Sequence, residues 1–94
     1  MGMRVARLVY GRVLDFVEMD GEFVIVRKGV PPSLVGKTLA EAGLRRRTGV
    51  TVVSVRRANA AAYEPAEPGT LLRAGDVIIV AGQRAEVDVF VALT

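Results

Sequence analysis

The 94-residue sequence contains no cysteine and no histidine. Without cysteine it has neither disulfides nor thiolate metal sites, which indicates a reducing compartment. Without histidine, Ser-His-Asp and Cys-His catalysis and His-ligated zinc or iron sites are excluded. We therefore expect no enzymatic activity, no catalytic residue, no metal site and no required cofactor.

Aromatic residues and long apolar runs are also scarce. Aromatics make up only 5% of the chain, and there is no tryptophan, so valine, leucine, isoleucine and alanine must build the core. No apolar run has the length of a membrane-spanning helix, and the N-terminal MGMRVARLVYG is too short and too charged for a signal peptide. With 51% hydrophobic and 24% charged residues, the sequence indicates one globular domain.

The charge balance is basic, with a net charge of +3 and a pI near 10.0. Such a balance favours an anionic partner, whether nucleic acid, acidic lipid or a phosphate-bearing ligand, although it is equally typical of a merely soluble basic domain. The basic residues are spread along the chain without interleaved aromatics or a recognition motif. We therefore expect no nucleic-acid partner, and a basic nucleic-acid-binding module is the less favoured hypothesis.

Hydrophobic periodicity predicts a small α+β fold, with a sheet of about four to five strands, covering helices and an N-terminal helix. Strand formers on both sides of a turn signal indicate a hairpin near the N-terminus. The final element fits a strand or a helix, and acidic residues near its start favour the helix. The predicted elements are a helix at residues 3–12, strands at Val13–Met19 and Glu22–Val30 around an Asp20-Gly21 turn, a helix from Lys37 to Ala42, strands at Val50–Val55, Ala62–Glu64 and Asp76–Ala81, and a helix at Gln83–Leu93.

The stretch from Gly36 to Arg57 organises the middle of the chain. Gly43 stands where a left-handed residue ends a helix, and Leu44 follows as the apolar residue that packs back on the last turn. Arg45–Arg47 then form an exposed basic turn, which either contacts phosphate or another subunit or is simply solvated. The valine-rich strand that follows is apolar on both faces, which predicts an interior strand.

Two segments, VPPSLVGKTLAEAGLRRRTGVTVVSVRR and LLRAGDVIIVAG, resemble the C-terminal regulatory domain of the TrkA/KtrA family, the RCK C-terminal domain. Upstream, RVARLVYGRVLDFVEMDGEFVIV is similar to the linker helix and first hairpin of that family. The resemblance implies a linker helix from a missing N-terminal domain at residues 3–12 and a TrkA-C domain at residues 13–94. No GxGxxG motif occurs, so we do not expect the family's nucleotide-binding Rossmann half in this sequence.

The resemblance implies a cytoplasmic regulatory subunit of a potassium uptake system, peripheral to the inner face of the membrane. Its partners would be a second copy of itself, in a homodimer, and a membrane potassium transporter subunit. In some members cyclic di-AMP binds across the dimer interface, so this is the ligand that the resemblance suggests. A ligand-free dimerisation or assembly domain of the same kind of subunit is the alternative.

The resemblance also suggests where such a ligand would bind. Arginine pairs bidentately with phosphate, and tyrosine or proline packs on a base. The alternative for the two arginines at the strand end is that they are solvated charges. A cluster of carboxylates at the first turn (Asp15, Glu18, Asp20 and Glu22) offers the oxygen ligands that a hard cation needs, but it lacks the spacing of a calcium loop, so a cation site is the less favoured interpretation. The ligand-binding residues implied by the resemblance are Val52, Val53, Arg56, Arg57, Tyr63 and Pro65.

Overall fold

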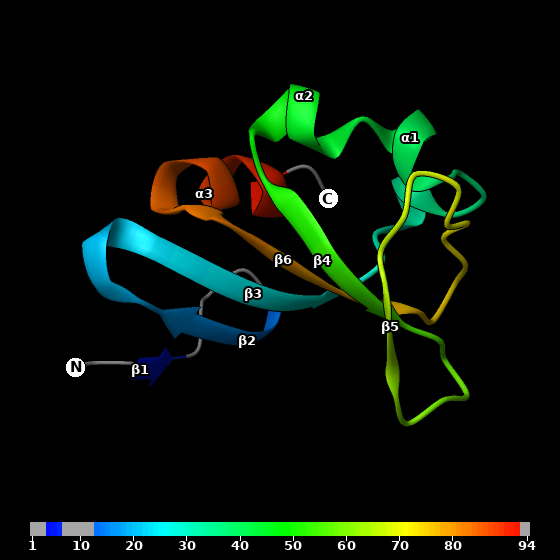
Figure 1. The fold of residues 1–94 in the computed structure, drawn as a ribbon, viewed down its shortest axis with the longest axis horizontal. Helices are drawn as coiled ribbons and strands as arrows, with labels where there is room; N and C mark the ends of the chain where they lie inside the picture. Colours follow the sequence, from blue (N-terminus) through cyan, green and yellow to red (C-terminus); the bar gives the residue numbers. More distant parts are fainter. Residues whose placement is uncertain (1–3, 7–12, 93–94) are drawn as a thin grey trace.

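The computed structural model describes residues 4–6 and 13–92. They form an antiparallel sheet of six strands, in the order β1-β2-β3-β6-β4-β5, with three helices on one face (Figure 1). This confirms the predicted α+β fold, with one strand more than expected. The strands are β1 (Arg4–Ala6), β2 (Val13–Glu18), β3 (Phe23–Gly29), β4 (Thr51–Arg56), β5 (Tyr63–Pro65) and β6 (Val77–Gln83), and the helices are α1 (Leu39–Ala42), α2 (Leu44–Thr48) and α3 (Arg84–Ala92).

The extra strand lies where the sequence predicts a helix. Arg4–Ala6 pair antiparallel with residues 16–18 of β2, so these three residues are extended and not helical. The remainder of the predicted helix, residues 3 and 7–12, lies outside the described part of the chain. A helix as short as residues 3–12 has little stability alone, whereas the edge of β2 offers unpaired backbone groups to a short strand.

The predicted hairpin is confirmed as β2 and β3. Its turn is a short 3₁₀ segment, Asp20–Glu22, in which Gly21 and Glu22 have φ angles of 72° and 70°. The backbone N–H of Met19 donates to the carbonyl of Phe23 at 2.7 Å and closes the turn. Because two consecutive residues adopt left-handed conformations, the second strand begins at Phe23, one residue later than predicted.

The core lies between the helices and the sheet face formed by alternate residues of β3, β6 and β4. Both interior strands predicted from their apolar sequences, β4 and β6, are confirmed in the sheet. On β3 the side chains of Val24, Val26 and Lys28 are fully buried, and the Lys28 Nζ lies 5.9 Å from the centroid of the Phe90 ring on α3. The core cluster comprises Val24, Val26, Leu34, Ala42, Leu44, Val50, Val55, Leu72, Ile78, Val80, Val87, Phe90 and Val91.

A β-bulge at Val53 interrupts the pairing of β4 with β6. Val52 pairs with Val80 and Ser54 with Ile79, which leaves Val53 without a partner on β6. The extra residue changes the alternation along β4, so that Val52 and Val55 both pack against the core. Val53 remains 48% exposed.

The helix predicted from Lys37 to Ala42 is shorter and begins at Leu39. Thr38 Oγ1 accepts from the Glu41 N–H at 3.1 Å, while Glu41 Oε1 accepts from the Thr38 N–H at 2.9 Å, a complete capping box. Gly43 is left-handed with φ 57°, and Leu44 is buried, both as predicted. The basic turn is exposed, but its residues are helical and belong to α2.

The C-terminal element is the predicted helix, α3. Glu86 Oε1 accepts from the backbone N–H of Gln83 at 2.9 Å, which satisfies a donor at the helix start. Arg84 Nη2 donates to Glu18 Oε2 at 2.6 Å and ties α3 to the end of β2. Over residues 4–6 and 13–92, no helix is long and apolar enough to cross a membrane.

Candidate functional site

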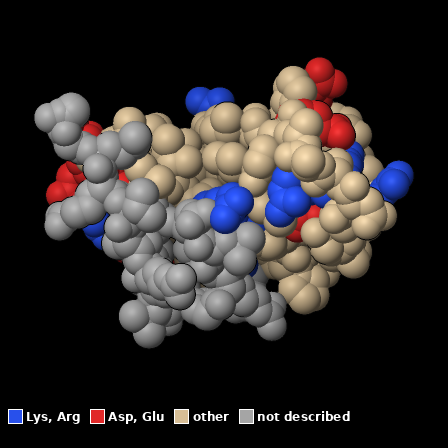
Figure 2. All heavy atoms as spheres, turned by 90° about the horizontal axis from the view of Figure 1, so that it is seen from below, with Lys and Arg blue, Asp and Glu red and all other residues tan. Residues whose placement is uncertain are grey.

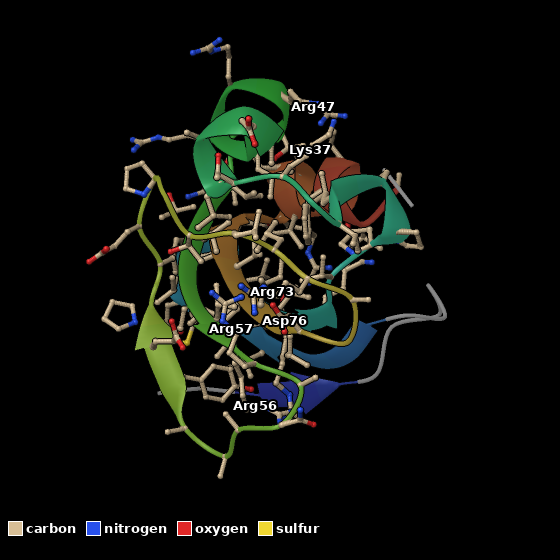
Figure 3. The ribbon with its side chains drawn as sticks, turned by 90° about the vertical axis from the view of Figure 1, so that its right-hand side faces the viewer. Lys37, Arg47, Arg56, Arg57, Arg73 and Asp76 are labelled. Atoms are coloured by element: carbon tan, nitrogen blue, oxygen red, sulfur yellow. The ribbon has the colours of Figure 1, made fainter. Side chains whose placement is uncertain are left out.

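The structure distributes the six predicted ligand-binding residues over different surfaces. Val52 packs on the helical side of the sheet, next to the core. Arg56 pairs with Tyr63 across β4 and β5, and both lie on the face away from the helices. Arg57 is directed toward Asp76, apart from Arg56 (Figure 3). The strand β4 ends at Arg56, and the two neighbouring arginines have different hydrogen-bond partners, the Ala60 carbonyl for Arg56 and Asp76 for Arg57.

An apolar hollow of about 250 Å³ lies beside Val52, between the two short helices and the edge of β4. Leu39 and Leu44 form its helical wall, and Val50 and Val52 form its floor. The opposite wall is the loop that follows β5. The residues that line the hollow are Leu39, Ala40, Leu44, Arg45, Val50, Thr51, Val52, Ala66, Glu67 and Pro68.

A second hollow adjoins the first on the surface of α1 and α2. It shares Leu39, Ala40, Leu44 and Arg45 with the apolar hollow and extends to Gly43 and Arg46. The side chains of Arg45 and Arg46 are exposed. The combined surface therefore offers apolar walls on one side and two guanidinium groups on the other, which suits a ligand with a flat ring and a phosphate.

The loop wall of the hollow is bonded to the helices along its length. The backbone N–H of Ala40 donates to the Pro68 carbonyl at 3.0 Å, and that of Leu39 donates to the Thr70 carbonyl at 2.9 Å. Leu72 and Gly36 extend this pairing, with Leu72 N donating to Lys37 O and Gly36 N to Leu72 O. The segment from residue 66 to 72 thus has a defined position although it contains no strand or helix.

Arg57 and Asp76 fasten the base of the same loop. Arg57 Nη1 donates to Asp76 Oδ2 and to the Leu71 carbonyl, each at 2.6 Å. Asp76, which is 2% exposed, also accepts from the backbone N–H groups of Ala58 at 3.2 Å and Arg73 at 3.1 Å. We call these bonds the Arg57–Asp76 clamp. They engage the guanidinium group of Arg57, one of the side chains expected to bind phosphate.

Arg56 and Tyr63 form a separate pair on the sheet face away from the helices. Figure 2 views the molecule from below, on the side opposite the helices, where basic side chains are visible. The Arg56 guanidinium carbon lies 5.7 Å from the Tyr63 ring centroid, and its Nη1 donates to the Ala60 carbonyl at 3.1 Å. Partial burial raises the pKa of the Tyr63 phenol, but hydrogen bonds and positive charge from Arg27 and Arg56 outweigh it, so the pKa lies below 10.0.

Pro65 and Val53 do not line the apolar hollow, but both adjoin Ala66, which does. Pro65 pairs with Ser54, and the next residue, Ala66, lines the hollow and donates its N–H to the Val53 carbonyl at 3.3 Å. Of the six predicted residues, Val52 alone lines the hollow. The sequence signal for Arg45 and Arg46 is the basic Arg45–Arg47 segment, for which a phosphate contact is one of the alternatives.

Two of the carboxylates near the first turn lie close to a basic side chain. Within the described residues, no group of three or more aspartate or glutamate side chains is placed to hold a metal ion. Instead, Glu18 and Glu22 lie near Arg84, at 2.6 Å and 3.9 Å. These two carboxylates therefore form ion pairs that connect the hairpin to α3.

Comparison with known proteins places the chain in a family. The chain is 36% identical over 83 residues to the Ktr system potassium uptake protein A of Vibrio alginolyticus, an alignment covering 87% of this chain and 37% of that protein. Two solved structures are similar: the GsuK channel bound to NAD (28% identity, TM-score 0.70, 78% of this chain and 14% of that one) and the GsuK RCK domain (22% identity, TM-score 0.71, 97% and 18%).

The chain spans little more than a third of the length of this curated relative, and less of the two structures. The profile of the TrkA-C domain matches residues 23–94, from the start of β3 to the C-terminal residue. This range includes both hollows, the Arg57–Asp76 clamp and all three helices. The chain therefore belongs to the TrkA-C domain family.

Proposed function

We propose that this chain is the C-terminal regulatory domain of a potassium-transport subunit, that it dimerises, and that it senses cyclic di-AMP at the dimer interface. The relative whose name states potassium uptake aligns over most of this chain, which supports the transport context. The observation that carries the ligand proposal is the apolar hollow with arginines at its rim. The proposed role is binding and not catalysis, because the sequence lacks histidine and cysteine.

The chemistry of the hollow fits one half of cyclic di-AMP. An adenine would lie against Leu39, Leu44 and Val52, and a phosphate would pair with Arg45 or Arg46. Pockets that enclose a whole drug-sized ligand have volumes of about 300–1,000 Å³. The apolar hollow, at about 250 Å³, is smaller than that and suits one ring.

A two-fold dimer would complete the site. Cyclic di-AMP consists of two identical halves, and an isologous interface presents the same surface from both subunits. Each copy would supply one apolar hollow and one pair of arginines. A domain of this size also gains stability from dimerisation, because a small chain buries a modest share of its surface.

The proposed mechanism is allosteric. The ligand would favour one relative arrangement of the two subunits, and this arrangement would act on a membrane potassium transporter subunit at the cytoplasmic face. The ligand shifts the equilibrium only if it binds one arrangement more tightly than the other. A site shared between two copies meets this condition, since a change in their arrangement changes the distance between the two hollows.

Isothermal titration calorimetry with cyclic di-AMP tests the proposal. We expect binding with one ligand per two chains, and weaker or no binding of AMP and NAD. Arg45→Gln should reduce the affinity by about tenfold or more, since a charged hydrogen bond contributes roughly 1.5–3 kcal/mol. Arg47→Gln is the matched control, because Arg47 has the same charge on the same helix but donates to the Ala42 carbonyl and does not line either hollow.

Two outcomes would contradict the proposal in different ways. A dimer in sedimentation experiments that gives no heat with cyclic di-AMP in the micromolar range would indicate a ligand-free assembly domain. Equal loss of affinity in Arg45→Gln and Arg47→Gln would show that general positive charge, and not the rim of the hollow, attracts the ligand.

A further inference from the structure

We propose that Arg57 is a positioning residue, which fixes the loop wall of the apolar hollow from behind and does not itself contact the ligand. The identity of the ligand rests on the proposed function. The positioning role of Arg57 rests on the contacts that its side chain makes in this chain. The side chain is 28% exposed, and one nitrogen, Nη1, donates to both Asp76 and the Leu71 carbonyl. Its Nε lies 3.7 Å from the Glu64 carboxylate.

The route from Arg57 to the hollow is short and consists of bonds already described. Arg57 holds the carbonyl of Leu71, and Leu71 forms a β-bridge with Thr38 immediately before α1. The neighbouring Thr70 carbonyl accepts the N–H of Leu39, a residue of the helical wall. Displacing Leu71 would therefore move both the loop wall and the start of α1.

Asp76 makes the clamp rigid. The carboxylate is almost fully buried and accepts from Arg57 and from two backbone N–H groups, at Ala58 and Arg73. A buried carboxylate requires such partners, because without them its desolvation is not offset. The two ends of the connection between β4 and β6 are thereby tied together, and the loop wall is held between them. In Figure 3, Arg57 and Asp76 lie side by side in this connection.

The discriminating variant is Asp76→Asn. If Arg57 bound the ligand directly, removing the carboxylate would release its guanidinium and leave cyclic di-AMP binding unchanged or tighter. If Arg57 positions the loop wall, Asp76→Asn and Arg57→Gln should both weaken binding, by about tenfold for a change transmitted through a contact network. Arg73→Gln is the control of equal charge, because Arg73 is exposed and contributes its backbone N–H to the clamp.

Hydrogen exchange measured by mass spectrometry supplies a readout that needs no ligand. Arg57→Gln and Asp76→Asn should each accelerate exchange in segments 36–40 and 66–72, and leave β3 and β6 at the wild-type rate. Arg73→Gln should change neither region. Unchanged exchange in the two segments, or a uniform increase along the chain, would overturn the inference.

The two experiments separate this inference from the proposed function. If the wild-type protein gives no heat with cyclic di-AMP, the proposed ligand is wrong, and the exchange data alone decide whether Arg57 fixes the loop wall. If cyclic di-AMP binds and Asp76→Asn retains full affinity, the ligand stands and the positioning role of Arg57 is overturned.

Discussion

Replacing Gly49 with alanine should destabilise the protein for two separable reasons. Gly49 ends α2 with φ 90°, a conformation that an L side chain rarely adopts. An added Cβ would also lie 2.7 Å from Oε2 of Glu86, inside contact distance. The glycine therefore provides both a backbone conformation and the space in which the Glu86 carboxylate packs at the start of α3.

The size of each effect follows from these contacts. A left-handed conformation costs a residue with a Cβ about 1–2 kcal/mol. Displacing Glu86 would weaken its bond to the Gln83 N–H at the start of the helix, a loss of about 1 kcal/mol for a typical capping interaction. Together we expect about 2–3 kcal/mol, which for a domain of this length lowers Tm by about 10–15 °C.

Gly36→Ala is the matched control. Gly36 has φ 88°, but nothing lies within 4 Å of an added Cβ, so only the backbone cost applies. Thermal unfolding followed by circular dichroism, at fixed protein concentration, should show a decrease in Tm of about 5–10 °C for this variant. The difference between the two glycine variants isolates the Glu86 contact.

A double-mutant cycle tests whether contact with the Glu86 side chain causes the extra loss of stability in Gly49→Ala. In a Glu86→Ala background the cost of Gly49→Ala should fall to that of Gly36→Ala, whereas in a Glu86→Gln background it should persist because the side chain keeps its volume. If Gly49→Ala costs the same with and without the Glu86 side chain, the steric argument is refuted.

Two further predictions concern β4 and β5. Val55→Ala should lower the free energy of unfolding by about 2 kcal/mol in chemical denaturation, since Val55 is fully buried. Val53→Ala, at the exposed bulge, should lower it by less than about 0.5 kcal/mol. Equal losses in the two variants would contradict the bulge. With the other tyrosine changed to phenylalanine, ultraviolet titration should give Tyr63 a pKa below 10.0 that rises in Arg56→Gln. Because the folded pKa is lowered, the Tyr63 contribution to stability is present above the unfolded pKa and is lost as pH falls through the folded pKa.

Several features of the site depend on contacts that no local pattern specifies. The bulge at Val53 arises where β4 pairs with β6, and it moves Val55 to the same side of the sheet as Val52. The partner of Arg57 is Asp76, which is 19 residues away in sequence. Arg56 and Arg57 are neighbours in sequence, but their side chains have different partners in space.

Sequence patterns alone determined the elements governed by local chemistry. Strand formers on both sides of a turn signal predicted the hairpin, and segments that are apolar on both faces predicted the interior strands. The sequence around Gly43 predicted the end of α1, because a left-handed helix end is a property of neighbouring residues. The ordered glycines and valine-rich segments also carried the family resemblance, which the match over residues 23–94 supports.

Only the tertiary structure decided which charges remain available to a ligand. Arg57 is engaged by a buried carboxylate and a carbonyl, while Arg45 is exposed beside an apolar hollow. The residues of that hollow come from α1, α2, β4 and the loop after β5, and they meet only when the sheet is paired and the helices pack on it. The sequence determines which side chains are charged, but packing between segments far apart in the chain determines the interaction partner of each one.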